Sequence, residues 1–458
     1  MAITGYSKDN AKQGIATMPA NRTFEVKALS RVEGEGALYV KLEGDRVSHV
    51  ELNIYEPPRF YEGFLRGREV REVSDIVARI CGICPVAYQM SASHALEKAL
   101  GVDVSPAIRT LRRLLYCGEW IESHALHVYL LHAPDFLGYE SGISMAADHK
   151  EAVERGLRMK KIGNELLEIL GGRAIHPINV AVGGFYRAPN KQKLRGLLPD
   201  LEWGLQASIE TLDLVSSFDF PAWEHEYELV SLQHADEYPL NHGQVVSSGG
   251  LRIDVEDYEN HFQERHLPQS TALHSVMLPE EKSYLVGPLA RLNLCFDQLP
   301  ATAREHAERC GIDWPSHNNF HSIVARAIEL IAAFEEAIEI VRAYQAEPSP
   351  SRAVVELRPG VGCHATEAPR GLLYHRYEIG EDHLIAHAKI VPPTSQNQGQ
   401  IEADLRNYVP SVTHLDDQAA TQKCEHLIRN YDPCISCATH FLTLTLDRGE
   451  RTAERSTL

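Results

Sequence analysis

The sequence lacks the features that mark membrane-spanning, nucleotide-binding and nucleic-acid-binding proteins. Its 458 residues contain no apolar run near the ~18–20 residues that a membrane-spanning helix needs. They contain no Gly-x-Gly-x-x-Gly or Gly-x-x-x-x-Gly-Lys-Ser/Thr motif, so we expect no nucleotide phosphate site of those kinds. With 63 acidic and 45 basic residues, the formal charge of −18 argues against a nucleic-acid partner.

The N-terminus also lacks the apolar stretch of a signal peptide, so we expect a cytoplasmic protein. Cytoplasmic thiols are normally kept reduced, and nine cysteines is an odd number. Patterned cysteines are therefore better explained by metal binding or catalysis than by a disulfide framework. The cysteines outside a pattern are expected to be ordinary packing residues.

The length exceeds what one compact core supports, since single cores stop growing near ~250–300 residues. The sequence predicts an α+β fold that is predominantly helical, with a long central helix bundle and smaller β-containing N-terminal and peripheral lobes. The expected segments are an N-terminal arm (1–22), a β-rich lobe (23–65), a helical core (66–216), a mixed α/β insert (217–305), a long core helix (306–347), a β-containing segment with a helix (348–440) and a C-terminal extension (441–458).

Local signals support this division. Alternating residues over 24–54 predict strand, turn and strand. Pro85 is well placed at the first position of a helix that Gly101 can end, and Ser105-Pro106 predicts the start of another. Apolar residues spaced three and four apart over 324–341 share one helix face, as in a buried core helix.

Four of the nine cysteines form two Cys-x-x-Cys pairs. Cys81 and Cys84 follow Arg79-Ile80, and Cys434 and Cys437 follow Asp432-Pro433, 350 positions later. Two intervening residues allow both thiolates of a pair to face one metal, and four thiolates select a thiophilic ion. A structural zinc site or a mononuclear iron site remains possible at this point. In either case a shared site would join opposite ends of the fold.

These motifs strongly resemble the two signatures of the nickel–iron hydrogenase large subunit. Further family landmarks occur in order, namely Arg31-Val-Glu-Gly, Gly-Arg-Ala-Ile-His176-Pro, Glu367-Ala-Pro-Arg-Gly and Val391-Pro-Pro-Thr. Two segments resemble the cytoplasmic, NAD(P)-linked bidirectional branch of the family, also called sulfhydrogenases. They are Glu56-Pro-Pro-Arg-Phe and Cys-Gly-Ile-Cys-Pro-Val-Ala-Tyr-Gln-Met. Glu35 and Tyr88 stand where membrane-linked and periplasmic members usually have His.

The resemblance implies a nickel ion held by Cys81, Cys84, Cys434 and Cys437. Cys84 and Cys437 would also bridge to an iron that carries cyanide and carbon monoxide. Thiolates are soft donors that suit nickel. Heterolytic cleavage of dihydrogen needs a Lewis-acidic metal and a base for the proton.

The resemblance also assigns roles around the metals. Arg370 would be suspended over them, with Asp135 and Asp432 as the carboxylates around it. Glu33 would accept protons near the terminal cysteine, because a carboxylate in a partly dry site can relay them. For Glu33 the simpler interpretation from the residues alone is an exposed turn glutamate. Thr394 would donate a hydrogen bond to a cyanide.

A second metal site follows from the same resemblance. Glu62, His440 and the backbone carbonyl of Lys389 would bind magnesium or a similar hard cation, which prefers oxygen ligands and tolerates an imidazole. A maturation protease would remove residues 441–458 after nickel-insertion factors have acted. The alternative for this tail is an ordinary frayed terminus.

The expected function is thus that of a hydrogenase catalytic subunit, which interconverts dihydrogen with protons and electrons. Electrons would pass to an iron–sulfur small subunit, then to flavin- and NAD(P)-binding partners, with the iron–sulfur clusters, flavin and NAD(P) on those partners only. Sulfur reduction is a further activity of such complexes. The alternatives are a non-catalytic quinone-site subunit of a complex I-like assembly and a zinc-stabilised scaffold. Metal content separates the three.

Overall fold

The computed structural model describes residues 21–44, 46–345 and 351–439. The predicted N-terminal arm, apart from residues 21 and 22, lies outside these ranges, as do His440 and the C-terminal extension. The described residues form an α+β fold, as the sequence predicts, in which helices predominate and the sheets are small.

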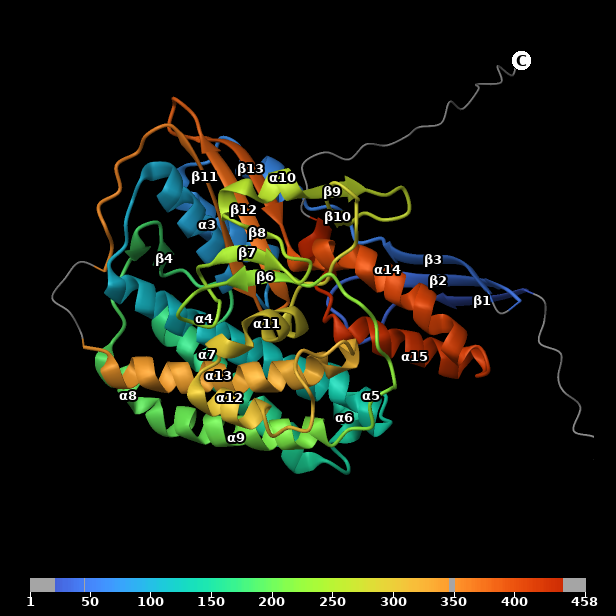
Figure 1. The fold of residues 1–458 in the computed structure, drawn as a ribbon. Coiled ribbons are helices and arrows are strands. Elements are labelled where there is room, and N and C mark those ends of the chain that lie inside the picture. The colour runs from blue at the N-terminus through green and yellow to red at the C-terminus, as the bar shows by residue number, and fades with distance from the viewer. Residues whose placement is uncertain (1–20, 45, 346–350, 440–458) are drawn as a thin grey trace, which may run out of the picture.

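The N-terminal sheet contains β1 (Asn21–Val26), β2 (Gly36–Glu43) and β3 (Arg46–Ile54), all antiparallel and in that order. Alternate residues such as Leu38, Val40 and Leu52 are buried, as the alternation of apolar and polar residues in the sequence predicts. This face packs with α14 (Pro393–Val412) and α15 (Asp417–Asn430), which come from the other end of the chain (Figure 1). The two ends of the sequence therefore meet in one hydrophobic cluster.

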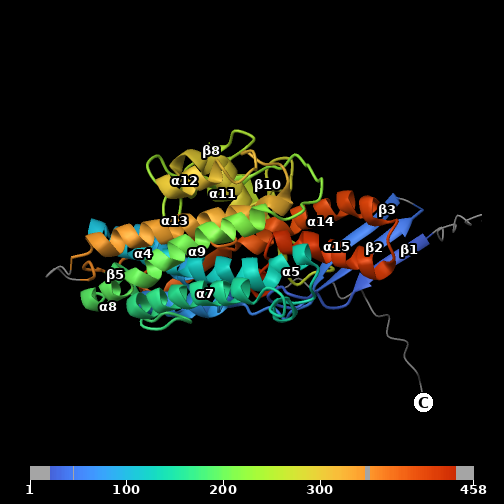
Figure 2. The ribbon, with the colours of Figure 1, turned by 90° about the horizontal axis from the view of Figure 1, so that it is seen from below.

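The main helical body consists of α4 (Pro106–Leu126), α7 (Lys150–Gly171), α9 (Leu198–Ser216) and α13 (Ser322–Ala343). Figure 2 shows these helices lying side by side along the long direction of the molecule. Helix α13 is buried over most of its length, as its apolar stripe predicts. Within the expected segment 306–347 the helix occupies only Ser322–Ala343. After α4 the chain continues as a π-helical turn, His127–His132.

Helix α3 (Pro85–Leu100) starts at Pro85 and ends at the left-handed Gly101, as predicted. One side of α3 is covered by the antiparallel sheet β11 (Gly360–Ala368), β12 (Gly371–Ile379) and β13 (Ile385–Val391). The approach is very close, because a Cβ at Gly362 would lie 2.1 Å from the carbonyl oxygen of Ala95. Only glycine allows this contact.

Shorter elements connect these parts. The helices are α1 (Tyr61–Leu65), α2 (Val70–Val77), α5 (Ala133–Leu137), α6 (Gly142–Met145), α8 (Lys191–Gly196), α10 (Tyr258–His261), α11 (Pro288–Cys295) and α12 (Ala301–Ala307). The strands are β4 (Val180–Ala181), β5 (Gly184–Phe185), β6 (Val230–Gln233), β7 (Gln244–Ser247), β8 (Arg252–Ile253), β9 (Phe262–His266) and β10 (Leu273–Met277). In the part of the chain described here, no helix has the length and apolar character required to cross a bilayer.

The close contact between α4 and α7 depends on a glycine of α7, which has no side chain. A Cβ at Gly163 of α7 would lie 2.7 Å from the backbone nitrogen of Glu122 and 2.7 Å from the carbonyl oxygen of Gly118. We expect Gly163→Ala to force the helices apart and to lower the free energy of unfolding by roughly 1–3 kcal/mol. Chemical denaturation should show this. Gly196→Ala is the matched control, because a Cβ there meets nothing within 4 Å; equal stability of the two variants would contradict the packing argument.

Candidate metal centre

The two cysteine pairs meet between the N-terminal sheet and the helical body. Cys81 follows a short 3-10 turn after α2, and Cys84 is the N-cap residue of α3. Cys434 and Cys437 lie just after α15, around the 3-10 turn Ile435–Thr439. The four Sγ atoms all lie within 4.8 Å of one another, and all four residues are buried. The predicted joining of the chain's two ends is therefore confirmed.

The sulfur atoms are close and receive backbone hydrogen bonds. Cys81 Sγ lies 3.6 Å from Cys434 Sγ, which lies 2.7 Å from Cys437 Sγ. The backbone N–H groups of Ile83 and Cys84 donate to Cys81 Sγ, at 3.3 and 3.2 Å. N–H donors directed at sulfur stabilise a thiolate, the form that binds metal.

The electrostatics favour a cation among these sulfurs. Hydrogen bonds from Cys434 and the other cluster thiols lower the pKa of Cys81 well below the usual thiol value. Burial, and then the neighbouring thiols, raises the pKa of Cys434 well above it. One thiolate is thus stabilised while its neighbours resist ionisation. A soft metal ion would let all four ionise together, so the donor set fits nickel or another thiophilic metal.

Glu119 and Arg59 hold this arrangement in place, although neither residue was predicted to have a role. Glu119 of α4 is fully buried and accepts hydrogen bonds from the N–H groups of Val86 and Ala87, at 2.6 and 3.0 Å. It therefore fixes the first turn of α3, directly after Cys84. A carboxylate at a helix N-terminus is also favoured by the helix dipole.

Arg59 connects the two cysteine segments. Its Nη2 donates to the carbonyl oxygen of Ile80, at 2.8 Å, and to that of Ser436. Its backbone N–H donates to the carbonyl oxygen of Thr439, at 2.7 Å. Ile80 and Ser436 each precede a cysteine of the cluster. The only sequence feature that pointed to Arg59 was the segment Glu56-Pro-Pro-Arg-Phe, to which it belongs.

Glu33 lies against the second pair. Its Oε2 is 3.1 Å from Cys434 Sγ and accepts a hydrogen bond from the Ser436 N–H at 3.1 Å. Its carbonyl oxygen accepts from the Ile435 N–H at 2.9 Å. The glutamate is half-buried and lies in direct contact with a sulfur, so it is not a free turn residue.

Arg370 and Asp432 form a buried pair beside the sulfurs. Arg370 Nε donates to the Asp432 carbonyl oxygen at 2.7 Å, and Nη2 donates to Oδ1 at 3.2 Å. Arg370 Nη1 is buried and has no hydrogen-bond partner among the described residues. Burial raises the pKa of Asp432, although the charge of Arg370 opposes that rise. The two N–H groups of Arg370 Nη1 are thus available for a ligand.

Asp135, predicted to be one of the carboxylates around Arg370, has its ion pairs with two other arginines. Its carboxylate accepts two hydrogen bonds from Arg429, both at 2.7 Å, and also binds Arg31 at 2.6 Å. Asp135 follows the π-helical turn in α5, where it reaches the N-terminal segment and α15. The second carboxylate affected by the charge of Arg370 is Glu122 of α4, whose pKa is raised by burial. Glu122 was not predicted.

A separate oxygen-rich site surrounds Glu62. Glu62 Oε1 accepts a hydrogen bond from the Ile390 N–H at 2.8 Å, next to Lys389 on β13. Burial, and then the charge of Glu62, raises the pKa of the nearby Glu264 to about 8. Glu62 is buried and Glu264 is half-buried, and two neighbouring carboxylates of this kind suit a hard cation. Glu264 was not predicted, and the predicted ligand His440 lies outside the described residues.

Thr394 lies at the start of α14, and its Oγ1 accepts a hydrogen bond from the Cys434 N–H at 3.0 Å. The predicted residues thus divide into three groups. Glu33, Arg370, Asp432 and Thr394 adjoin the sulfur cluster, whereas Glu62 and Lys389 lie together at the oxygen-rich site and Asp135 belongs to a different ion-pair network.

This geometry defines a metalloenzyme with a buried four-thiolate centre, flanked by a buried arginine and a carboxylate in contact with sulfur. The nickel-dependent hydrogenase family matches the chain over residues 59–156 and 280–440. The chain belongs to this family, and it is the large subunit of a nickel–iron hydrogenase.

Individual relatives agree with this assignment. The chain is 33% identical to the alpha chain of sulfhydrogenase 1 of Pyrococcus furiosus over 420 residues, 91% of this chain and 97% of that one. It is also 33% identical to the alpha chain of sulfhydrogenase 2 of the same organism, over 92% of this chain and 100% of that one. Among solved structures, an NAD⁺-reducing [NiFe]-hydrogenase in the H₂-reduced state superimposes with a TM-score of 0.82 at 27% identity, covering 92% of this chain and 100% of that chain. The [NiFeSe]-hydrogenase of Dm. baculatum, at 21% identity and TM-score 0.74 over 92% of this chain and 100% of that one, shares the fold.

Proposed function

We propose that this subunit cleaves and forms dihydrogen within a cytoplasmic complex that exchanges electrons with NAD(P). The four buried thiols within 4.8 Å carry this proposal, because they provide the soft donor set that nickel requires. Support for the acceptor comes from the NAD⁺-reducing enzyme that shares the fold. The free state of all nine cysteines supports a reducing compartment.

The bound Ni-Fe centre, with cyanide and carbon monoxide on the iron, would supply the Lewis acidity and the electron pair acceptor for heterolytic cleavage. Cys81, Cys84, Cys434 and Cys437 would hold it, with Cys84 and Cys437 in the bridging positions. Glu33 then accepts a proton at Oε2, which lies 3.1 Å from Cys434 Sγ. This distance is within hydrogen-bond range for a sulfur donor, so proton transfer needs no large movement.

Arg370 acts as a fixed cation next to the sulfurs. Asp432 holds Nε and Nη2, which leaves the Nη1 N–H groups to orient a base or the bound gas. Because the site is buried, water does not compete for these donors, and each contact is stronger than it would be in solution. We propose that Thr394 adds a hydrogen bond from its hydroxyl to a cyanide, while its oxygen accepts from Cys434.

The electrons would leave through an iron–sulfur small subunit. Phe60, Ile175 and Ile178 are large apolar residues that remain exposed. They lie near the first cysteine pair, because Tyr61 donates a hydrogen bond to the Arg79 carbonyl and His176 contacts that of Ala78. An exposed apolar patch beside a buried redox centre is a suitable docking face. Flavin- and NAD(P)-binding subunits would complete the complex.

Two further elements belong to this proposal. Glu62, with the Lys389 carbonyl and His440, would bind magnesium, and Glu264 provides a second carboxylate close by. A maturation protease would cleave after His440 once the nickel-insertion factors have acted. Intact mass of the active enzyme should then lack residues 441–458, and a full-length chain in the active enzyme would contradict cleavage.

The acceptor is tested with the purified complex. We expect H₂-dependent reduction of NAD⁺ or NADP⁺, together with H₂-dependent reduction of an artificial viologen dye. Dye reduction without either nicotinamide reaction would retain the hydrogenase but overturn the acceptor. Absence of cyanide and carbon monoxide infrared bands in a nickel-containing preparation would overturn the proposed iron ligands.

Glu33→Gln should slow proton transfer without disturbing the metals. The amide keeps the size of the carboxylate but cannot take up a proton at neutral pH, so we expect H₂ oxidation to fall by roughly 100-fold or more. Nickel content and infrared bands should stay as in the wild type. Glu35→Gln, two residues away, is the control and should be nearly neutral. Wild-type turnover by Glu33→Gln would exclude the relay role.

A further inference from the structure

Pro369 and Arg370 form the tight turn that joins β11 to β12, and Arg291 of α11 holds the backbone of this turn. Arg291 Nη1 donates to the carbonyl oxygen of Ala368 at 2.8 Å, and Nη2 donates to that of Pro369 at 3.0 Å. These two carbonyl groups come immediately before Arg370 in the chain. Arg291 is completely buried, so water does not compete for its hydrogen bonds.

The guanidinium of Arg291 uses all five of its N–H groups. Nε and Nη2 donate to Glu329 of α13 at 2.7 and 2.8 Å, and Nη1 donates to Glu367 at 3.0 Å. With the two carbonyl oxygens, this makes five hydrogen bonds, the full number that an arginine can donate. Burial opposes the ionisation of Glu329, but the charge of Arg291 lowers the pKa of this carboxyl to about 2. The pair is therefore ionised, and the orientation of Arg291 is fixed.

Two further contacts hold the turn against its surroundings. The guanidinium carbon of Arg291 lies 4.4 Å from the ring centroid of Trp120, whose Nε1 donates to the carbonyl oxygen of Glu367 at 3.1 Å. Gly287 is the N-cap residue of α11 and has a φ of +122°. A Cβ there would lie 2.9 Å from the Arg370 carbonyl oxygen. Helix α11 thus lies close to the turn at both Gly287 and Arg291.

Arg370 is held from two directions. Arg291 fixes the backbone before it, and Asp432 binds its Nε and Nη2, so the place of the unpartnered Nη1 depends on both contacts. We propose that Arg291 and Glu329 form a positioning pair for the hydrogenase reaction, which acts through the turn to hold Arg370 Nη1 toward the reacting molecule. This positioning role rests on the role proposed above for Arg370.

The test uses Arg291→Lys in the purified, nickel-loaded complex. Lysine offers three donors in place of five, so it cannot bind Glu329 through two nitrogens and also hold both carbonyl groups. A misplacement of about 1 Å can cost roughly 100-fold in rate, so we expect kcat per nickel to fall by roughly 10–100-fold. KM for H₂ should change little, because the supported contact is made in the transition state. Hydrogen–deuterium exchange of the peptide that contains Arg370 should become faster, whatever the activity.

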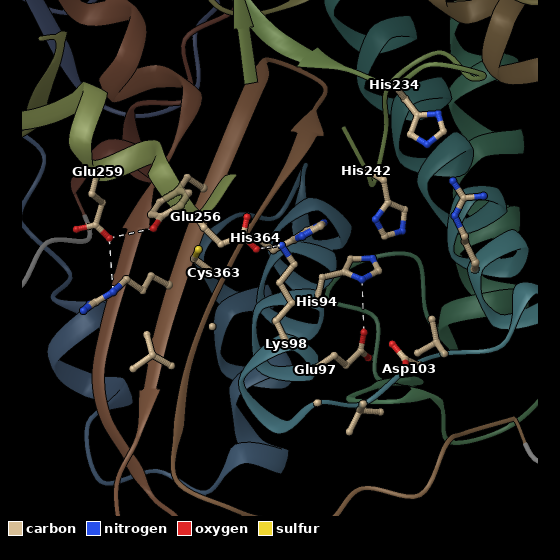
Figure 3. Close-up of a pocket in the computed structure, with 18 residues that line it drawn as sticks. His94, Glu97, Lys98, Asp103, His234, His242, Glu256, Glu259, Cys363 and His364 are labelled. Atoms are coloured by element: carbon tan, nitrogen blue, oxygen red, sulfur yellow. Dashed lines mark hydrogen bonds and ion pairs between the residues drawn. The ribbon is translucent and has the colours of Figure 1, made fainter. Parts of the chain in front are cut away.

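Arg112→Lys is the matched control for the loss of a buried arginine. Arg112 is completely buried and donates to Glu97 at 2.5 and 2.8 Å and to the Ala181 carbonyl oxygen at 3.2 Å. Figure 3 shows Glu97 directed toward His94 at a cavity of about 1230 Å³, and none of the described residues that line this cavity belongs to 367–371. The control should lower the thermal unfolding midpoint, as Arg291→Lys does, but should keep the turnover per nickel and the exchange of the turn.

A double-mutant cycle shows whether Arg291 acts through Arg370. In the Arg370→Lys background, Arg291→Lys should cause little further loss of turnover, because the group that it positions is already absent. Additive losses of turnover would overturn the proposal. If Arg370→Lys lowers turnover and Arg291→Lys does not, the positioning role fails while the role of Arg370 stands. Normal turnover by Arg370→Lys would instead remove the role of Arg370 itself.

Glu329→Gln keeps the proposal testable if Arg291→Lys does not yield a folded complex. Glutamine has nearly the same shape, but its amide nitrogen cannot accept a hydrogen bond, so Arg291 loses one of its five acceptors. We expect a lower kcat per nickel and faster exchange of the peptide that contains Arg370. Wild-type kcat and exchange in this variant would overturn the proposal.

Discussion

A Cys437→Ser enzyme should contain little nickel or iron and should lose hydrogen oxidation by at least ~100-fold. Serine keeps the size of the side chain but replaces a soft thiolate with a hard, poorly acidic hydroxyl, which suits neither metal. The loss is larger than for an isolated ligand, because Cys437 is one of four sulfurs within 4.8 Å and is proposed to bridge both metals. Elemental analysis, the cyanide and carbon monoxide infrared bands, and dye-linked H₂ oxidation measure the effect.

Cys310→Ser is the appropriate control for this experiment. Cys310 is half-buried after α12, where its thiol donates to the Ala307 carbonyl at 3.2 Å, an interaction that a serine hydroxyl can replace. This variant should retain metals and activity. A Cys437→Ser protein with full metal content and normal turnover would remove the bridging assignment.

Arg370→Lys should retain the metals but lower the turnover of H₂ by roughly 100–1000-fold, the range seen when one preorganised donor is lost from an active site. Lysine keeps the positive charge that Asp432 requires in this buried position. It cannot bind Asp432 through two nitrogens and also direct a third N–H group toward the reacting molecule. The expected signature is a low kcat with normal nickel content and infrared bands.

Two comparisons separate a chemical role of Arg370 from a structural one. Arg370→Met removes the charge and leaves Asp432 buried without this partner, so the variant should also lose stability, by about 3–5 kcal/mol. Arg342→Lys, at an exposed ion pair with Glu202, should leave stability and turnover unchanged. If Arg370→Lys turned over at the wild-type rate, the guanidinium would have only a structural role.

Much of the fold was predictable, because the residues that begin and end elements agree with the pattern of apolar residues that become buried. The alternation over β2 and β3, the Pro85 start and Gly101 end of α3, and the apolar stripe of α13 each identified an element. The core helix is nevertheless shorter than its expected segment. It ends before the Pro-Ser-Pro of 348–350 but begins only at Ser322, because α12 ends at Ala307 and a loop separates the two helices.

The site residues were predictable where they belong to a recognisable sequence motif. Residues that reach the site from another helix were less predictable. The four cysteines follow from their spacing and from the family signatures. Arg59 and Glu119 bind the backbone beside the cysteines, Glu122 is influenced by the charge of Arg370, and Glu264 by that of Glu62. None of these four positions has a local signal in the sequence, so only the folded chain identifies them. The ion pairs of Asp135 also become visible only in the folded chain. Its motif suggested a place near Arg370, and Arg31 and Arg429 are the arginines that bind its carboxylate.

The Arg59 contact has a consequence for how the protein is made. Arg59 binds backbone carbonyls beside Cys81 and beside Cys437, and the second of these belongs to Ser436, 377 positions after Arg59. Until the second cysteine pair has been synthesised, the first pair offers only two thiols, and Arg59 lacks its second carbonyl partner. Closing a loop of about 350 residues carries a loop-closure entropy that a metal bound at both ends would help to offset. Metal binding at the cluster is thus coupled to the joining of two segments that lie far apart in the sequence.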